Sequence, residues 1–202
     1  MTVIGITGPS GAGKGALSSL LNQKYGFPVI DADKVYHSLV SAPSECVTEI
    51  RRKFGDGVID EKGALDRRAL GKIVLGEENK EKLVILNKIT HKYVVEEIMK
   101  SINDFDKKDY SACIVDAPLL IEAGLVSSCD MTFAVLADRQ IRAERISARD
   151  GISVTDAMRR IDSQKSDDFY IQNTDHTLIN NSDLNSLFSS VTGVLIERRV
   201  IE

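Results

Sequence analysis

The chain has 202 residues, 43% of them hydrophobic and 28% charged, with only four prolines, which excludes a disordered or fibrous protein and predicts one globular domain. Its formal net charge of −4 gives no general positive field for nucleic acid, and no apolar stretch approaches the length of a membrane span, so we expect neither partner. Three widely separated cysteines without a C-x-x-C pair favour reduced thiols and a cytoplasmic protein over a disulfide framework or a zinc site.

A phosphate-binding loop is predicted near the start of the chain. Gly8-Pro9-Ser10-Gly11-Ala12-Gly13-Lys14 follows the apolar run Val3-Ile4-Gly5-Ile6-Thr7 and precedes a helical pattern that ends at Gly26. This succession of strand, loop and helix is the context that the motif G-x-x-x-x-G-K requires. We expect the glycines to turn backbone N–H groups toward a phosphate, and Lys14 to reach the terminal phosphates.

The residue after the lysine departs from the usual motif. Gly15 and Ala16 stand where a Ser or Thr hydroxyl normally ligates Mg²⁺. The Lys-Gly pair resembles the loops of nucleoside monophosphate kinases, and the whole loop resembles that of cytidylate kinase. Such a kinase is therefore a rival interpretation.

Two acids follow the next predicted strand, Phe27-Pro28-Val29-Ile30. Asp31 and Asp33 come at its end, and in open parallel sheets ligands collect outside the carboxyl ends of the strands. Aspartate is also a favoured N-cap, so either residue could instead only begin the helix that contains Val35 and Leu39.

A helical insertion is predicted over about residues 31–110, because helical patterns and turns occur there without a long β-rich run. Between Leu83 and Ile98 apolar residues recur at helical spacing, which predicts a long helix with one buried stripe. His91 on that helix is interpreted as a structural histidine.

A third acid ends the apolar run Ala112-Cys113-Ile114-Val115, which predicts a strand buried on both faces. This acid, Asp116, resembles a Walker-B residue that holds Mg²⁺ directly or through water, although a purely structural aspartate is the alternative. Further strands are predicted over Met131 to Ala137 and over Thr177-Leu178-Ile179-Asn180, before a terminal amphipathic helix.

Between those strands lies an arginine-rich helical pair. Arg142, Arg145 and Arg149 have spacings of three and four, which place them on one helical face, where guanidinium groups could clamp phosphate in a lid. Nearby acids such as Asp150 and Asp162 support the alternative of a solvated, salt-bridged face.

Segments outside the phosphate loop resemble the dephospho-coenzyme A kinase family. They are Val29-Ile30-Asp31-Ala32-Asp33, Phe54-Gly55 with Gly63 to Leu70, Ile89-Thr90-His91, Asp116 to Glu122, and Arg145 through Arg160 to Gln164. The resemblance implies an α/β protein with a P-loop kinase fold, in which helices flank a central parallel sheet. Its core is expected over residues 1–30, 111–137 and 166–202, with an acceptor-binding insertion over 31–110 and a lid over about 138–165.

The resemblance also implies an activity, namely transfer of the ATP γ-phosphoryl group to the ribose 3′-hydroxyl of dephospho-coenzyme A in the last step of coenzyme A synthesis. The enzyme is expected to be a monomer or a weak homo-oligomer that uses ATP and Mg²⁺. The implied catalytic residues are Lys14, Asp33 and Arg145, the ATP-binding residues are Gly8, Gly11, Ala12, Gly13, Lys14, Gly15, Ala16, Arg142 and Arg149, and the metal ligand is Asp116.

Two alternatives remain open from the residues themselves. A cytidylate or other monophosphate kinase would need an arginine cradle for its phosphate acceptor, and the acids Asp31 and Asp33 stand in that place. A nucleotide-binding switch without catalytic activity would share the loop and the lid.

Overall fold

The computed structural model describes residues 1–202. The chain forms two compact units. One unit comprises Met1–Ile30 and Ile102–Glu202, and the other comprises Asp31–Ser101. No helix of the chain combines the length and the apolar character that crossing a membrane would need.

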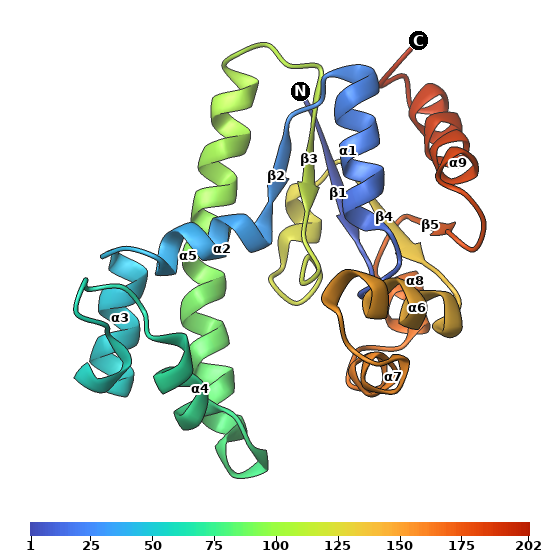
Figure 1. Ribbon diagram of the computed structural model, residues 1–202. Coiled ribbons are helices and arrows are strands. Elements are labelled where there is room, and N and C mark those ends of the chain that lie inside the picture. Colours follow the sequence, from blue (N-terminus) through green and yellow to red (C-terminus); the bar gives the residue numbers. More distant parts are fainter. The chain divides into compact units, whose positions relative to one another are not determined.

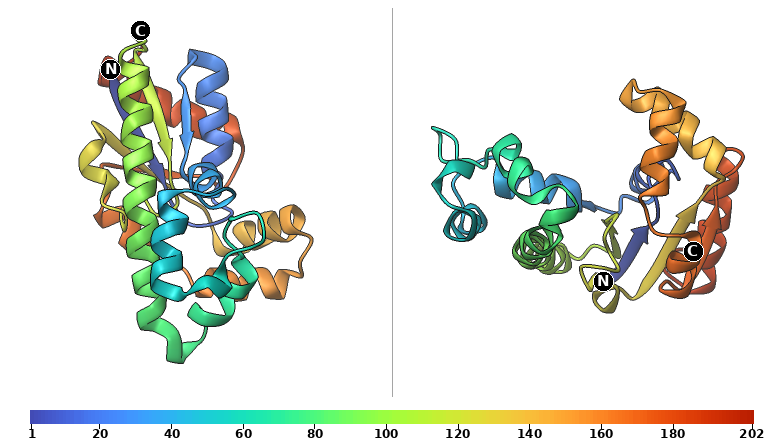
Figure 2. Two further views of the ribbon diagram at one scale, coloured as in Figure 1. Left: turned by 90° about the vertical axis from the view of Figure 1, so that its left-hand side faces the viewer. Right: turned by 90° about the horizontal axis from the view of Figure 1, so that it is seen from below.

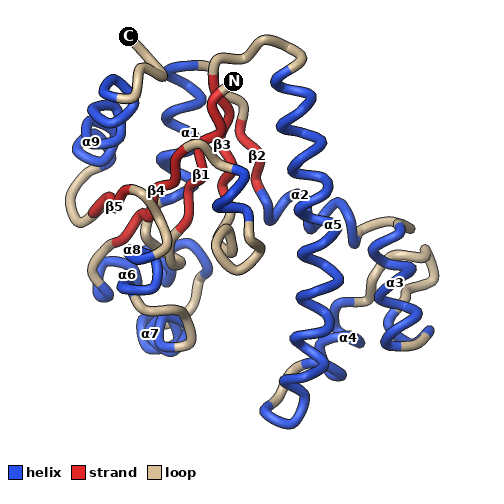
Figure 3. Tube along the Cα trace, turned by 180° about the vertical axis from the view of Figure 1, so that it is seen from behind, coloured by secondary structure: helices blue, strands red, loops and turns tan.

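The first unit contains a five-stranded sheet with the order β2-β3-β1-β4-β5. Its strands are β1 (Thr2–Thr7), β2 (Val29–Asp31), β3 (Ala112–Asp116), β4 (Met131–Leu136) and β5 (His176–Ile179). β1 pairs in parallel with β3 and β4, and β4 pairs in parallel with β5. All the strands of the chain belong to this sheet (Figure 3). The predicted α/β class with a central parallel sheet is confirmed.

Two helices cover one face of the sheet, α1 (Lys14–Tyr25) and α9 (Leu184–Glu197) (Figure 1). Their buried leucines and valines pack against the apolar side chains of β1, β3, β4 and β5. α1 ends where the sequence predicted, because Gly26 adopts a left-handed conformation and its N–H closes on the carbonyl of Asn22. The strong burial of this cluster explains why these helices could be predicted from their apolar spacing.

A pair of helices follows β4, α6 (Arg139–Asp150) and α7 (Val154–Asp162), which pack side by side (Figure 2). Ala143 and Ile146 of α6 meet Ala157 and Ile161 of α7 in a small buried cluster. The hydroxyl of Ser153 accepts a hydrogen bond from the N–H of Asp156 and so caps α7. The shorter helices α8 (Asp167–Gln172) and η3 (Leu125–Ser128) complete this unit.

The second unit consists of helices, turns and loops. Its helices are α2 (Ala32–Val40), α3 (Glu45–Phe54), η1 (Asp56–Val58), α4 (Arg67–Val74), η2 (Glu77–Asn79) and α5 (Lys80–Asp106). The last residues of α5, from Ile102, belong to the first unit. The predicted stripe on the long helix is confirmed, since Leu86, Ile89 and Ile98 are buried. The predicted limits of the insertion and the lid remain predictions.

Candidate active site

The phosphate loop, Gly8 to Gly13, joins β1 to α1 and is shaped by backbone angles that L-residues disfavour. Gly8 has φ +136° and Gly13 has φ +108°. A Cβ on Gly8 would collide with the backbone carbonyl of Val135, and one on Gly13 would collide with the side-chain amide of Asn180. The glycines therefore allow the loop to lie directly against β4 and against the end of β5.

Residues outside the motif hold the loop in this shape. The amide of Asn180, a buried residue, donates to the carbonyl of Ala12 at 2.7 Å. The side-chain amide oxygen Oε1 of Gln164 accepts from the backbone N–H of Ser10 at 3.3 Å and from the guanidinium of Arg142 at 2.6 Å. This role of Asn180 was not predicted from the sequence. An asparagine directly after a strand, at the edge of the sheet that carries the loop, is the signal that could have found it.

Lys14, the first residue of α1, folds back over the loop. Its ammonium donates to the carbonyls of Gly8 at 2.8 Å and of Pro9 at 3.2 Å. The ammonium group of Lys14 is thus held over the glycine-rich turn, which is where phosphate is predicted to bind.

Asp116 ends β3 next to the end of β1, because Ile6 and Asp116 are register partners. Its carboxylate accepts a hydrogen bond from the hydroxyl of Ser18 at 2.8 Å, and Ser18 is buried. A Cβ on Gly15 would lie 3.8 Å from the same carboxylate oxygen. Ser18 was missed because the motif places the hydroxyl directly after the lysine, whereas here it comes one helical turn later.

The carboxylate of Asp116 and the hydroxyl of Ser18 form a donor set that is compatible with a magnesium ion. The chain contains no cluster of three acidic, histidine or cysteine side chains that could hold a metal by itself. Mg²⁺ in phosphoryl-transfer sites needs fewer protein ligands, since it is typically bound by one or two carboxylates together with waters and substrate phosphates. A single carboxylate beside a hydroxyl therefore agrees with such a site.

The three arginines that share one face of α6 all contact the phosphate loop. Arg142 is only 3% exposed, donates through Nε to the carbonyl of Ser10 at 3.0 Å, and has its pKa lowered by burial. Arg145 makes long contacts of 3.4 and 3.5 Å with the carbonyls of Gly11 and Ala12. Arg149 lies 3.3 Å from the hydroxyl of Ser10. Arg142 thus contacts the loop as a buried residue, while Arg145 and Arg149 are more exposed to solvent.

An acid also neutralises part of this face. Asp150 pairs with Arg149 and Arg160, and these two guanidinium groups lower the pKa of its carboxyl to about 2. The hydrogen bond to Asp150 raises the pKa of Arg149. The salt-bridged face, which was the alternative interpretation of the arginine helix, is therefore present at these residues, and the phosphate clamp stays a prediction.

The two acids of the helical unit differ in their surroundings. Asp31 caps α2, because its carboxylate accepts from the N–H of Lys34 at 3.0 Å, and it also pairs with the ammonium of Lys34 at 3.1 Å. Asp33, in the first turn of α2, is exposed and has no hydrogen bond or ion pair within the chain. The N-cap interpretation is therefore confirmed for Asp31.

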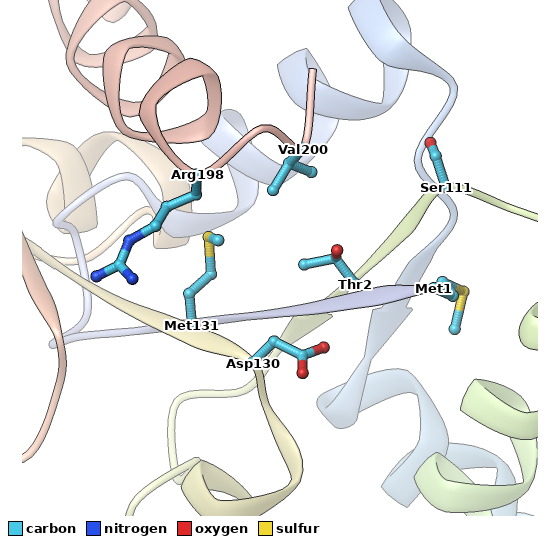
Figure 4. Close-up of a pocket in the computed structure, with 7 residues that line it drawn as sticks. All are labelled: Met1, Thr2, Ser111, Asp130, Met131, Arg198 and Val200. Atoms are coloured by element: carbon cyan, nitrogen blue, oxygen red, sulfur yellow. The ribbon is translucent and has the colours of Figure 1, made fainter. Parts of the chain in front are cut away.

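A separate pocket lies at the amino-terminal end of the strands, opposite the phosphate loop (Figure 4). It is lined by Met1, Thr2, Ser111, Asp130, Met131, Arg198 and Val200. In the figure the Arg198 side chain comes from the end of α9 and the Asp130 side chain from the residue that precedes β4. None of the predicted site residues lines this pocket.

The chain matches known proteins over nearly its whole length. The model of the dephospho-CoA kinase family matches residues 2–186. A dephospho-CoA kinase from Fusobacterium nucleatum is 38% identical over 189 residues, which is 94% of each chain. The dephospho-CoA kinase of Saccharomyces cerevisiae is 35% identical over 199 residues, or 96% of this chain and 82% of that one.

Solved structures agree with this assignment. The dephospho-CoA kinase from Campylobacter jejuni has a TM-score of 0.69 at 25% identity, covering 97% of this chain and 96% of that chain. Fold, phosphate loop and sequence similarity lead to one conclusion: the chain belongs to the dephospho-CoA kinase family.

Proposed function

We propose that the protein transfers the γ-phosphoryl group of ATP to the ribose 3′-hydroxyl of dephospho-coenzyme A, which gives coenzyme A and ADP. The observation that carries this proposal is the extent of the family match, because residues 2–186 include the phosphate loop, all five strands of the sheet and the whole helical unit. A phosphate loop alone would fit many kinases. A match that includes the helical unit supports dephospho-coenzyme A as the acceptor, and the two curated relatives named above are dephospho-CoA kinases.

The donor side of the reaction is assigned to the first unit. The backbone N–H groups of Gly8 and of residues 11–16 bind the phosphates of ATP, and Lys14 neutralises charge on the terminal phosphates. Arg145 stabilises the charge that develops in the loose transition state, and Arg149 helps it to hold the nucleotide. Arg142 was also expected to bind ATP, but its donors are directed to Ser10 and Gln164, so we assign it instead to support of the loop.

The acceptor side is assigned to Asp33. The 3′-oxygen forms a bond to the γ-phosphorus while the bond from that phosphorus to the β,γ-bridging oxygen breaks, and ADP leaves with the electron pair. The proton of the 3′-hydroxyl passes to the carboxylate of Asp33 late in the reaction. Asp31 is less suited to this role because its carboxylate already caps α2.

Asp116, with Ser18 beside it, is assigned to a magnesium site. When bound, Mg²⁺ would neutralise charge on the β- and γ-phosphates. The contribution of the chain is one carboxylate whose orientation is fixed by the hydroxyl of Ser18.

We also propose that the enzyme acts in the cytoplasm, as a monomer or a weak homo-oligomer, and binds no nucleic acid. The net charge of −4 supports the absence of a nucleic-acid partner, and the three free cysteines support a cytoplasmic location.

An acceptor panel tests the proposed function. ADP release is followed with ATP and Mg²⁺ in the presence of dephospho-coenzyme A, cytidine monophosphate, adenosine monophosphate, shikimate or no acceptor. We expect ADP release that depends on dephospho-coenzyme A. Faster release with a nucleoside monophosphate would contradict the proposal and favour the rival kinase class.

A further inference from the structure

In the helical unit, Arg67 lies between two aromatic side chains. Its two terminal nitrogens are 2.8 Å from Nδ1 and 3.2 Å from Nε2 of His37, and its Cζ lies 5.5 Å from the ring centroid of Tyr36. A guanidinium only donates hydrogen bonds, and a neutral imidazole has a single accepting nitrogen. At most one of the two contacts with His37 is therefore a hydrogen bond.

The chain provides no acid for this pair. No carboxylate lies within ion-pair distance of Arg67 or His37. The neighbouring carboxylate of Asp66 accepts from the N–H groups of Arg68 and Ala69, at 2.9 Å each, and so caps α4. An exposed guanidinium thus lies beside an exposed imidazole, with donors available to an external anion.

The backbone holds the two side chains in position. His37 lies in the last turn of α2, and Arg67 is the first residue of α4. The N–H of Leu65 donates to the carbonyl of Val40 at 3.0 Å, and both residues are buried in the core of the helical unit. The pair is therefore part of the folded framework, and an anion would meet groups that are already ordered.

Asp33 indicates which anion this site would take. It precedes His37 by four residues on α2, so the two side chains share one helical face about 6 Å apart along the axis. We infer that Arg67 and His37 bind the 5′-diphosphate of the acceptor nucleotide, whose ribose reaches Asp33 with its 3′-hydroxyl. This inference rests on the proposed function. It fits because a single ribose ring joins the 3′-hydroxyl to the 5′-phosphate.

Calorimetric binding tests the inference without turnover. Dephospho-coenzyme A, and adenosine as a probe with the same ribose but no diphosphate, are titrated while a non-hydrolysable ATP analogue fills the nucleotide site. The proteins are the wild type, Arg67→Gln, Arg67→Lys and the matched control Arg68→Gln. We expect Arg67→Gln to weaken binding of dephospho-coenzyme A on the order of 10- to 100-fold, the loss typical of a charge-assisted contact. Arg67→Lys should recover part of it, and Arg68→Gln should bind like the wild type.

The adenosine arm separates contact from structure. If Arg67 only supports the fold, Arg67→Gln weakens adenosine and dephospho-coenzyme A alike, which overturns the inference, as does an unchanged affinity for dephospho-coenzyme A. If the wild type binds dephospho-coenzyme A through Arg67 but does not phosphorylate it, the proposed function fails and the binding site stands. A wild type that does not bind the compound overturns both.

Discussion

The carboxylate of Asp31 is engaged by Lys34, whereas the carboxylate of Asp33 has no partner within the chain. This difference leads to a prediction. Asp33→Asn preserves shape but cannot accept the 3′-hydroxyl proton, so we expect kcat to fall on the order of 10²-fold or more. The KM for ATP should change little, because Asp33 belongs to the acceptor side. Steady-state kinetics with both substrates varied measure the two effects separately.

The matched control is Asp31→Asn. Asparagine is as good an N-cap as aspartate, so α2 should keep its start and the variant should lose only the exposed pair with Lys34. We expect nearly normal kcat and thermal stability. A larger loss of kcat in Asp31→Asn than in Asp33→Asn would show that the catalytic role belongs to Asp31.

Gly15 allows the magnesium assignment to be tested by adding the missing hydroxyl. The position is exposed, and its Cβ would lie 3.8 Å from the carboxylate of Asp116, so a serine there has room to share a metal ion with that acid. We expect Gly15→Ser to need less Mg²⁺ for half-maximal activity, and Asp116→Asn to need more in either background. Titrations of rate against Mg²⁺ concentration would contradict the assignment if Asp116→Asn left the midpoint unchanged.

Many of the site residues could be predicted from the sequence because short-range chemistry determines them. The glycine pattern implies the loop, and an acid after a buried strand implies the sheet edge where Asp116 lies. Ser18 and Asn180 could not be found in this way. Their roles depend on contacts with residues 98 and 168 positions away in the chain, which only the packing of α1, β3 and β5 creates.

The junctions between the loop and its neighbouring strands lead to a prediction about packing. Gly8 has φ +136°, and a Cβ there meets the rigid carbonyl of Val135 in β4. Gly8→Ala should therefore destabilise the protein by about 2 kcal/mol or more, because neither the φ angle nor the strand can adjust cheaply. Denaturant unfolding of the purified variant measures the free-energy change.

The same substitution has the opposite expected sign at Gly193. This residue lies inside α9, and nothing within 4 Å would meet its new Cβ. Gly193→Ala should stabilise the protein by roughly 0.5 to 1 kcal/mol, since alanine loses less backbone entropy in a helix. Destabilisation of similar size in both variants would mean that the strain at Gly8 is not specific to the loop.

Element limits were predicted less well than element types, and the reason is local. The second strand was expected from Phe27 but begins at Val29, because Pro28 has no N–H to donate and contributes only its carbonyl, which accepts from Ile114. The long helix was identified by its apolar stripe, although it extends to Asp106, well beyond the last stripe residue. Apolar spacing therefore locates the buried part of a helix and not its solvated end.

The division of the molecule into two units predicts unequal local stability. Cys46 lies in the core of the helical unit, Cys113 lies in the sheet unit, and burial raises the pKa of both thiols to about 11. At pH 8 the native thiols stay protonated, so alkylation requires opening, which restores an ordinary thiol pKa. The helical unit is the smaller one, and we expect Cys46 to be labelled first.

Mass spectrometry of the alkylated peptides measures the two rates, with the denatured chain as the reference in which both thiols react at similar rates. Equal rates in the native protein would mean that the two units open together as one cooperative structure.

The fate of the transferred phosphate is the most direct test of the proposed phosphoryl transfer. The enzyme is given ATP labelled in its γ-phosphate, together with Mg²⁺ and dephospho-coenzyme A, and the labelled product is isolated and its phosphate located by ³¹P NMR. We predict one labelled phosphate per ADP formed, attached to the ribose 3′-oxygen. Label released as inorganic phosphate, or attached at another position of the acceptor, would contradict the proposed activity.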